Sequence, residues 1–214
     1  MEQILHTSAL MLEGSKVTLE IFLLTLMMAL PLGLLVALAR LSGLGVLRWA
    51  MEFYIWIMRG TPLMLQLLFV YFALPMVGVK LNDISSALLA FTMNYAAYFA
   101  EIFRAGIQSI PRGQYEASKT LGFTYVQTMR HIIIPQMVAR VLPPVSNETI
   151  NLVKDTSLIY ILAMNDLLRV ARTIVQREFD MTPFFIAAVF YLVMTFVLTW
   201  VFKKLEAHYA KYID

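Results

Sequence analysis

Long apolar segments alternate with short polar ones along the whole chain. A helix that crosses the bilayer core, which is about 30 Å thick, needs about 20 mostly apolar residues. Four segments meet that length and carry charged side chains only near one of their ends. We therefore predict membrane-spanning helices over residues 17–39, 55–79, 84–103 and 181–203.

A fifth segment, residues 132–154, is long enough to span but contains Arg140, Glu148 and the pair Pro143–Pro144. Charged side chains are costly at membrane depth, so this helix is expected to face protein or water. Apolar runs of this length without strict alternation do not match the strands of a membrane barrel. The prediction is an all-α membrane protein with about five transmembrane helices and a single domain over residues 1–214.

The composition agrees with a protein embedded in a lipid bilayer. Hydrophobic residues make up 60% of the chain and charged residues only 14%, and the mean hydropathy is +0.72. These values are typical of membrane proteins. The chain contains no cysteine, which excludes disulfides, thiolate metal sites and cysteine nucleophiles.

Neither a metal site nor a catalytic site can be assembled from the sequence. The three histidines, His6, His131 and His208, lie far apart without the spacing of metal ligands. No serine, histidine and aspartate arrangement or pair of carboxylates stands out as catalytic. The net charge of +3 is small and is explained by membrane topology, so no nucleic-acid partner is expected.

The distribution of Lys and Arg predicts the orientation, because cytoplasmic loops carry an excess of them. With the N-terminus outside, the inner segments hold nine such residues and the outer segments six. The inner residues are Arg40, Arg48, Arg104, Arg112, Lys119, Arg130, Lys203, Lys204 and Lys211, and the outer ones are Lys16, Lys80, Lys154, Arg169, Arg172 and Arg177. The C-terminus and residues 104–131 are therefore expected on the cytoplasmic side.

The cytoplasmic loop, residues 104–131, has the pattern of two short helices joined at an angle. Pro111 suits a first helical turn, and Gly122 suits the left-handed residue that ends a helix. Thr124 and Gln127 have the spacing of a capping box, which starts the second helix. The first helix, about ten residues long, is too short to be stable alone in water, so it is expected to pack against something.

The spacing within this loop resembles a signature of ABC importer permeases. The stretch "EASKTLGFTYVQTMRHIIIP", residues 116–135, matches E-A-A-x3-G-x9-I-x-L-P except for Ser118 and Ile134, which replace Ala and Leu. The stretches "RGTPLMLQLLFVYF", "NYAAYFAEIFRAGIQSIPRGQYEAS" and "LVKDTSL" resemble the polar amino acid branch of that family. The resemblance covers nearly the whole chain.

The resemblance implies a permease domain with a type I ABC importer-like bundle in the bacterial inner membrane. The chain has no G-x-x-x-x-G-K-[ST] motif, so ATP and Mg would be held by separate ABC ATPase subunits. The family also implies a second permease chain, identical or related, and an extracytoplasmic amino-acid-binding protein. The expected coupling helix would contact the ATPase through Arg112, Glu116, Ala117, Ser118, Lys119 and Gly122.

Polar residues at helical spacing indicate where a solute could pass. Asn94, Tyr98 and Glu101 share one face of the third span at i, i+4 and i+7. A similar face on the fourth span, at i, i+3 and i+7, follows its proline pair. The predicted substrate-binding residues are Asn94, Tyr98, Glu101, Asn147, Glu148, Asn151 and Asp155.

The acidic surplus among these residues favours arginine, histidine or lysine as the cargo. Two structural alternatives stay open: Glu101 pairs with Arg104, and Glu148 pairs with Arg140 or with a cation of a partner subunit. A different class of protein, a pore or secondary-transporter subunit without an ATPase, would use the same polar faces but would not need the cytoplasmic signature.

The prolines predict where the helices are irregular. Pro143–Pro144 is expected to break or bend the fourth span and free carbonyls that need partners. Pro31, Pro62 and Pro75 are interpreted as ordinary kinks. Residues 156–180 are amphipathic and too charged to span, and they predict an external helix.

Overall fold

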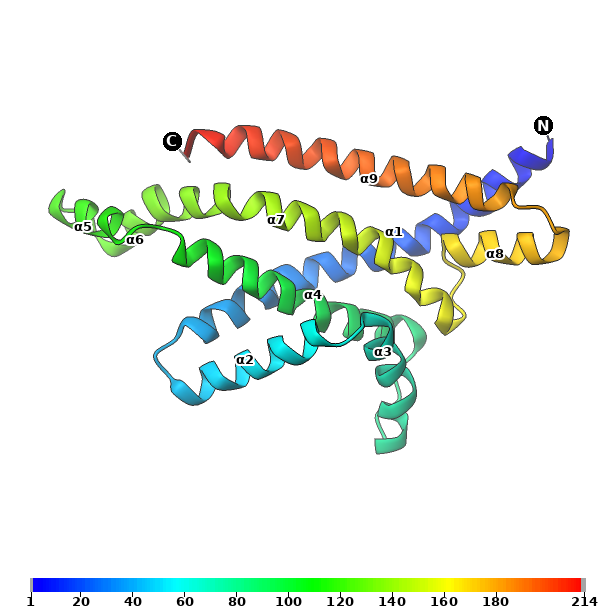
Figure 1. The fold of residues 1–214 in the computed structure, drawn as a ribbon, viewed down its shortest axis with the longest axis horizontal. Helices are drawn as coiled ribbons and strands as arrows, with labels where there is room; N and C mark the ends of the chain where they lie inside the picture. Colours follow the sequence, from blue (N-terminus) through cyan, green and yellow to red (C-terminus); the bar gives the residue numbers. More distant parts are fainter. Residues whose placement is uncertain (1, 213–214) are drawn as a thin grey trace.

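The computed structural model describes residues 2–212, with side chains from Thr7 onward, and within this range the protein contains helices and no strand. Four long helices form the body of the molecule (Figure 1). They are α1 (Glu2–Leu41), α4 (Asp83–Gln108), α7 (Ile134–Asp155) and α9 (Thr182–Tyr209). The all-helical prediction is confirmed.

Two helices of the described residues are long and apolar enough to span a membrane, Thr7–Leu41 and Thr182–Tyr212. A third is obtained if α2 (Gly45–Gly60) and the helix after it are counted as one bent span. Helices α4 and α7 have 26 and 22 residues but carry more polar side chains. The count of five spans therefore stays a prediction.

Helix α1 begins well before residue 17, where the first span was predicted to start. Its early turns are buried by α8 (Leu167–Glu178), since Met11 is fully buried in a cluster with Leu167 and Ala171. Tertiary packing, and not only membrane thickness, sets the length of this helix.

The second predicted span, residues 55–79, is not one helix. The chain bends by 105° between α2 and the segment that begins with α3 (Leu63–Leu68). Thr61 is extended, with φ −120° and ψ 147°, as expected for a residue that precedes proline. After α3 the chain continues as η1 (Phe69–Ala73) and η2 (Leu74–Val77).

The interpretation of Pro62 as an ordinary kink was wrong, and the predicted break at Pro143–Pro144 is absent. Pro62 marks a sharp break instead of an ordinary kink. Helix α7 instead runs through Pro143–Pro144 without interruption. A proline removes one backbone donor wherever it stands, but its neighbours decide whether the helix ends there.

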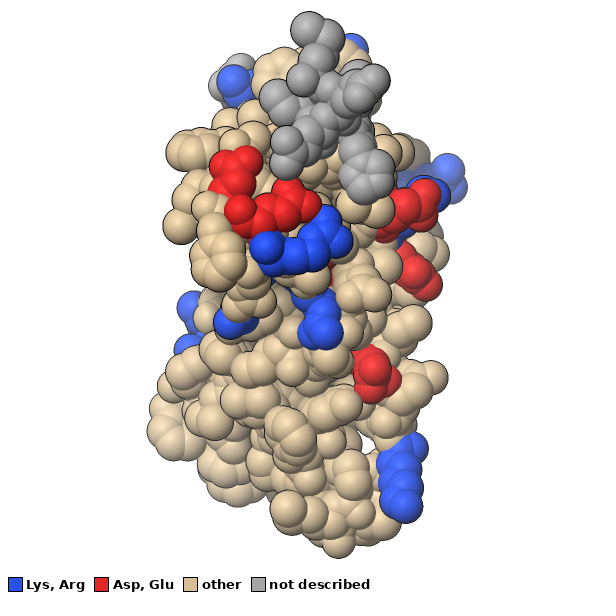
Figure 2. Space-filling view, turned by 90° about the vertical axis from the view of Figure 1, so that its right-hand side faces the viewer, with Lys and Arg blue, Asp and Glu red and all other residues tan. Residues whose placement is uncertain are grey.

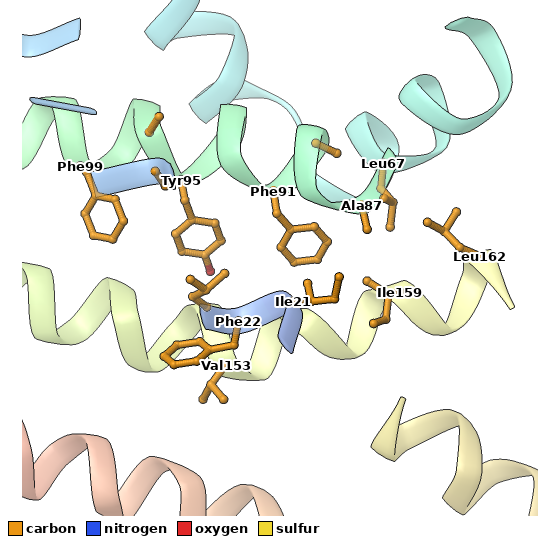
Figure 3. Close-up of a cluster of buried hydrophobic side chains, with 14 of the residues drawn as sticks. Ile21, Phe22, Leu67, Ala87, Phe91, Tyr95, Phe99, Val153, Ile159 and Leu162 are labelled. Atoms are coloured by element: carbon orange, nitrogen blue, oxygen red, sulfur yellow. The ribbon is translucent and has the colours of Figure 1, made fainter. Parts of the chain in front are cut away.

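Helix α4 is the centre of the core. Phe91, Tyr95 and Phe99 are buried and follow one another at i, i+4 and i+8. Figure 3 shows the three side chains on one side of α4, pointing toward α7. Ala97 and Ala100 are buried against α1 and α2, where small residues allow close packing.

Gly33 of α1 lies directly against α4, and we expect Gly33→Leu to destabilise the protein. A Cβ atom at this position would lie 2.7 Å from Phe99 Cβ and 3.0 Å from the Ala96 carbonyl oxygen. Overpacking of this kind costs about 2 kcal/mol. The measurement is thermal unfolding of the purified protein in detergent. Gly43→Leu is the control, because a Cβ at Gly43 meets no atom within 4 Å, and equal melting temperatures for both variants would refute this contact.

The predicted helix pair of the loop is confirmed as α5 (Arg112–Thr120) and α6 (Tyr125–Thr128), which leads through η3 (Met129–Ile133) into α7. Pro111 is the N-cap of α5 and stands just outside its first turn. The capping box of Thr124 and Gln127 is present as predicted.

The two ends of the molecule carry different elements. Helices α5 and α6 lie at the same end as the C-terminus and η5 (Ala210–Tyr212), whereas α8 and the N-terminus lie at the opposite end (Figure 1). The expected amphipathic segment after residue 155 is present as η4 (Thr156–Leu162) and α8. Figure 2 views the molecule from the end that carries α8 and the N-terminus. Acidic and basic side chains gather near α8 on this face, and the rest of it is mostly uncharged.

Candidate functional site

A polar cavity of about 570 Å³ lies between the α2–α3 break, α4 and α7. Five of the seven predicted substrate-binding residues line it: Asn94, Tyr98, Glu148, Asn151 and Asp155. The helical spacing thus identified two faces that the fold brings together. Arg59, Thr61 and Tyr95 also line the cavity and were not predicted.

Asn94 stabilises the break between α2 and α3 through hydrogen bonds. Its Nδ2 donates to the Met58 carbonyl oxygen and to Gln66 Oε1, both at 3.0 Å. Gln66 Nε2 in turn donates to the Met58 carbonyl at 2.9 Å and to Thr61 Oγ1 at 2.7 Å. Carbonyls at the end of a helix need such partners, above all inside a membrane.

The α7 wall of the cavity is acidic. Glu148 and Asp155 stand on one face with Asn151 between them, and Tyr95 of α4 donates its hydroxyl to Asp155 Oδ2 at 2.7 Å. Among the described residues, no Lys or Arg forms an ion pair with either carboxylate. This wall can therefore accept hydrogen bonds from a cation.

Arg59 provides the positive charge of the cavity. It lies in the last turn of α2, and its guanidinium carbon is 5.3 Å from the ring centroid of Tyr98. One of its nitrogens is 3.9 Å from Glu101 Oε2. The sequence held a signal for this residue, since Arg59 directly precedes the Gly-Thr-Pro of the break.

Two predicted residues lie outside this cavity. Glu101 borders a neighbouring cavity of about 430 Å³, and it pairs with Arg40 and, at 2.8 Å, with Arg104. The Glu101–Arg104 alternative is thus present in the structure. Asn147 is exposed on α7 and lines neither cavity.

Arg140 provides no partner for Glu148. Its Nη1 donates to the carbonyl oxygen of Ser109 instead. The Glu148–Arg140 ion pair is therefore absent from the described residues, whereas pairing of Glu148 with a cation of a partner subunit stays open.

The corner between α5 and α6 is exposed and is held by local hydrogen bonds. Gly122 has φ +79°, the left-handed conformation that favours glycine. The buried hydroxyl of Ser118 donates to the Tyr115 carbonyl at 2.9 Å and accepts from the Thr128 hydroxyl at 3.0 Å. Ser118 therefore braces the corner from inside.

The remaining predicted coupling residues, Arg112, Glu116, Ala117 and Lys119, are exposed. No ion pair joins the charged ones in the described part of the chain. An apolar surface lies beside them and was not predicted from the sequence. It is made by Leu121, Tyr125 and Val126, each at least 70% exposed. Charged and apolar groups together on a projecting corner are typical of a docking surface.

A helical bundle with a polar cavity at a broken helix is an arrangement suited to a subunit of a membrane transporter. Residues 29–211 match the family described as binding-protein-dependent transport system inner membrane component, and the chain belongs to that family.

Curated relatives extend over nearly the whole chain. The probable amino-acid ABC transporter permease protein YckA of Bacillus subtilis is 38% identical over 94% of this chain and 90% of its own length. The arginine transport system permease protein ArtQ of Bacillus subtilis is 35% identical over 91% and 90%. The glutamine transport system permease protein GlnP of Escherichia coli is 37% identical over 92% and 91%.

Solved structures agree with this assignment. A crystal structure of an amino acid ABC transporter with histidines has a TM-score of 0.87 and 32% identity, covering 96% of this chain and 97% of that one. An inward-facing MetNI methionine ABC transporter has a TM-score of 0.74 at 18% identity, covers 94% and 96%, and shares the fold.

Proposed function

We propose that this chain is the permease subunit of an ATP-driven ABC importer for basic amino acids. The polar cavity between the α2–α3 break, α4 and α7 is the observation that carries the proposal. Relatives named for amino acid, arginine and glutamine transport support an amino acid as cargo. Because those names differ in cargo, the choice among amino acids rests on the residues of the cavity.

The charges of the cavity fit a basic amino acid. An amino acid brings a carboxylate and an ammonium, and each needs a partner when it leaves water. Arg59 matches the carboxylate, whereas Glu148 and Asp155 accept from cationic groups. Two carboxylates against one guanidinium leave an excess negative charge, which a second cationic group on the cargo would balance.

The corner formed by α5 and α6 is proposed as the coupling helix. Its exposed charged residues and the apolar surface of Leu121, Tyr125 and Val126 support docking to an ABC ATPase subunit. ATP and Mg would bind to that subunit. A second permease chain, identical or related, would complete the translocation path, and an extracytoplasmic binding protein would deliver the cargo.

The proposed orientation places α5, α6 and the C-terminus in the cytoplasm of a bacterial cell and the N-terminus outside. The excess of Lys and Arg in the inner segments supports it. Five crossings also require the two termini to lie on opposite sides, in accord with their positions at opposite ends of the molecule (Figure 1).

Glu148→Gln is expected to lower arginine uptake at least about tenfold, because it removes a desolvated charge partner of the cargo. Glutamine uptake should change little, since its side chain is neutral. Transport into proteoliposomes containing the assembled complex measures both, after assembly and ATPase activity have been checked.

The control is Asp83→Asn, which makes the same charge change in the exposed first turn of α4, outside the cavity. Equal arginine uptake by the two variants would end the assignment of Glu148. An equal loss of arginine and glutamine uptake in Glu148→Gln would place this residue in assembly or translocation instead of charge recognition.

A further inference from the structure

A second polar cavity, of about 370 Å³, lies at the end of the molecule that carries α5 and the C-terminal segment. It shares no lining residue with the transport cavity. Three segments far apart in the sequence meet there: the start of α5, the stretch from η3 into α7, and η5. The side chains that matter are Gln114, His131, Gln136, Arg140, Lys211 and Tyr212.

The described part of the lining is basic. Arg140, Lys211 and His131 line the cavity, and no Asp or Glu is among its described lining residues. Within residues 7–212, no ion pair involves any of the three. Such a set of donors suits an anion with several acceptor oxygens.

Two of the basic side chains, Arg140 and Lys211, keep donors free within the described part of the chain. Arg140 uses an N–H for the Ser109 carbonyl, and a guanidinium has five N–H groups. The Lys211 ammonium lies 5.1 Å from the ring centroid of Tyr212. His131 Nδ1 donates to the Gln127 carbonyl at 3.0 Å, so Nε2 of the neutral ring is an acceptor and becomes a donor only in the imidazolium form.

The position along α9 places this cavity near the headgroups of the bilayer. Lys204 Nζ lies 3.6 Å from the ring centroid of Trp200, and Trp with Lys is typical of a helix at the membrane surface. Lys211 lies seven positions after Lys204, which is about 10 Å along a helix. Because the headgroup layer is roughly 5–7 Å thick on each side of the hydrocarbon core, Lys211 lies at the outer edge of that layer, a few ångströms farther from the core.

We propose that this cavity binds a phosphate group, presented at this depth by the headgroup of an anionic phospholipid. Basic pockets at the cytoplasmic ends of helices bind such headgroups. A zwitterionic lipid also carries a phosphate, but none of the described lining residues is an acid that could accept its cationic group. The site is independent of the cargo and of Glu148.

Native mass spectrometry of the detergent-purified transporter tests the proposal. Phosphatidylglycerol and phosphatidylcholine are added at equal concentration, and the lipid retained by each variant is counted. The wild-type protein should retain phosphatidylglycerol preferentially. Lys211→Gln should bind it about fivefold more weakly, the effect of one basic residue near the surface. Lys203→Gln is the matched control, because Lys203 is an exposed lysine of the same helical stretch outside the cavity.

Equal retention of the two lipids, or an equal loss in Lys211→Gln and Lys203→Gln, would overturn the proposal. Arg140→Gln provides a second variant, which should weaken phosphatidylglycerol binding as Lys211→Gln does. Displacement of the lipid by millimolar inorganic phosphate, only when Lys211 is present, would support the same chemistry with a soluble source. Loss of the ATPase subunit from Lys211→Gln with lipid retention unchanged would assign the cavity to a protein interface and reject the lipid.

Discussion

Gly122→Val is expected to reduce ATP-driven uptake at least about tenfold while the protein still inserts into the membrane. Gly122 has φ +79°, and a β-branched residue in this conformation costs on the order of 2 kcal/mol. A Cβ at Gly122 would meet no atom within 4 Å, so the cost comes from the backbone alone. The corner would open or lose its fixed angle, and α5, as the proposed coupling helix, could then no longer transmit movement from an ATPase subunit.

The measurement compares uptake with ATP hydrolysis in the reconstituted complex. Gly113→Val is the matched control, because Gly113 lies in α5, has open space around it and does not have a positive φ. This control should transport at nearly the wild-type rate. Wild-type uptake by Gly122→Val at wild-type protein levels would show that the angle of the corner is not needed for coupling.

The corner could be predicted from the sequence because its determinants are local. Gly122 fixes the left-handed residue, and Thr124 with Gln127 starts the next helix within four residues. None of these effects requires knowledge of distant segments. The bracing hydrogen bond between Ser118 and Thr128 joins residues ten positions apart and was not foreseen.

The break between α2 and α3 could not be predicted from the local sequence pattern, because residues elsewhere in the fold stabilise it. Pro62 lies in an apolar segment that reads as one span, whereas Pro143–Pro144 lies among polar residues that suggested a break. At the break before Pro62, the Met58 carbonyl oxygen accepts hydrogen bonds from Gln66 and from Asn94, a residue of another helix. Periodicity correctly paired the polar faces of α4 and α7 but could not add Arg59, which reaches the cavity only because α2 ends there.

Glu101→Gln is expected to destabilise the protein by about 3 kcal/mol, the cost of removing one partner from a largely buried ion pair. The side chain of Glu101 is 18% exposed, and those of Arg40 and Arg104 are 21% and 26% exposed. Without Glu101, the guanidinium groups around it repel one another, and Glu52, 3.6 Å from Arg40, is the remaining acid in the ion-pair cluster of the described residues. Thermal unfolding and assembly of the purified complex measure the loss.

A double-mutant cycle separates the two roles that the sequence left open for Glu101. If it holds the arginines, Arg104→Gln should cost less in the Glu101→Gln background than alone, because its partner is already gone. Uptake of arginine and glutamine by Glu101→Gln should then fall together, in proportion to the assembled protein. Unchanged stability with a selective loss of arginine uptake would instead make Glu101 a cargo residue, and the cavity that it borders with Arg59 would become part of the binding site.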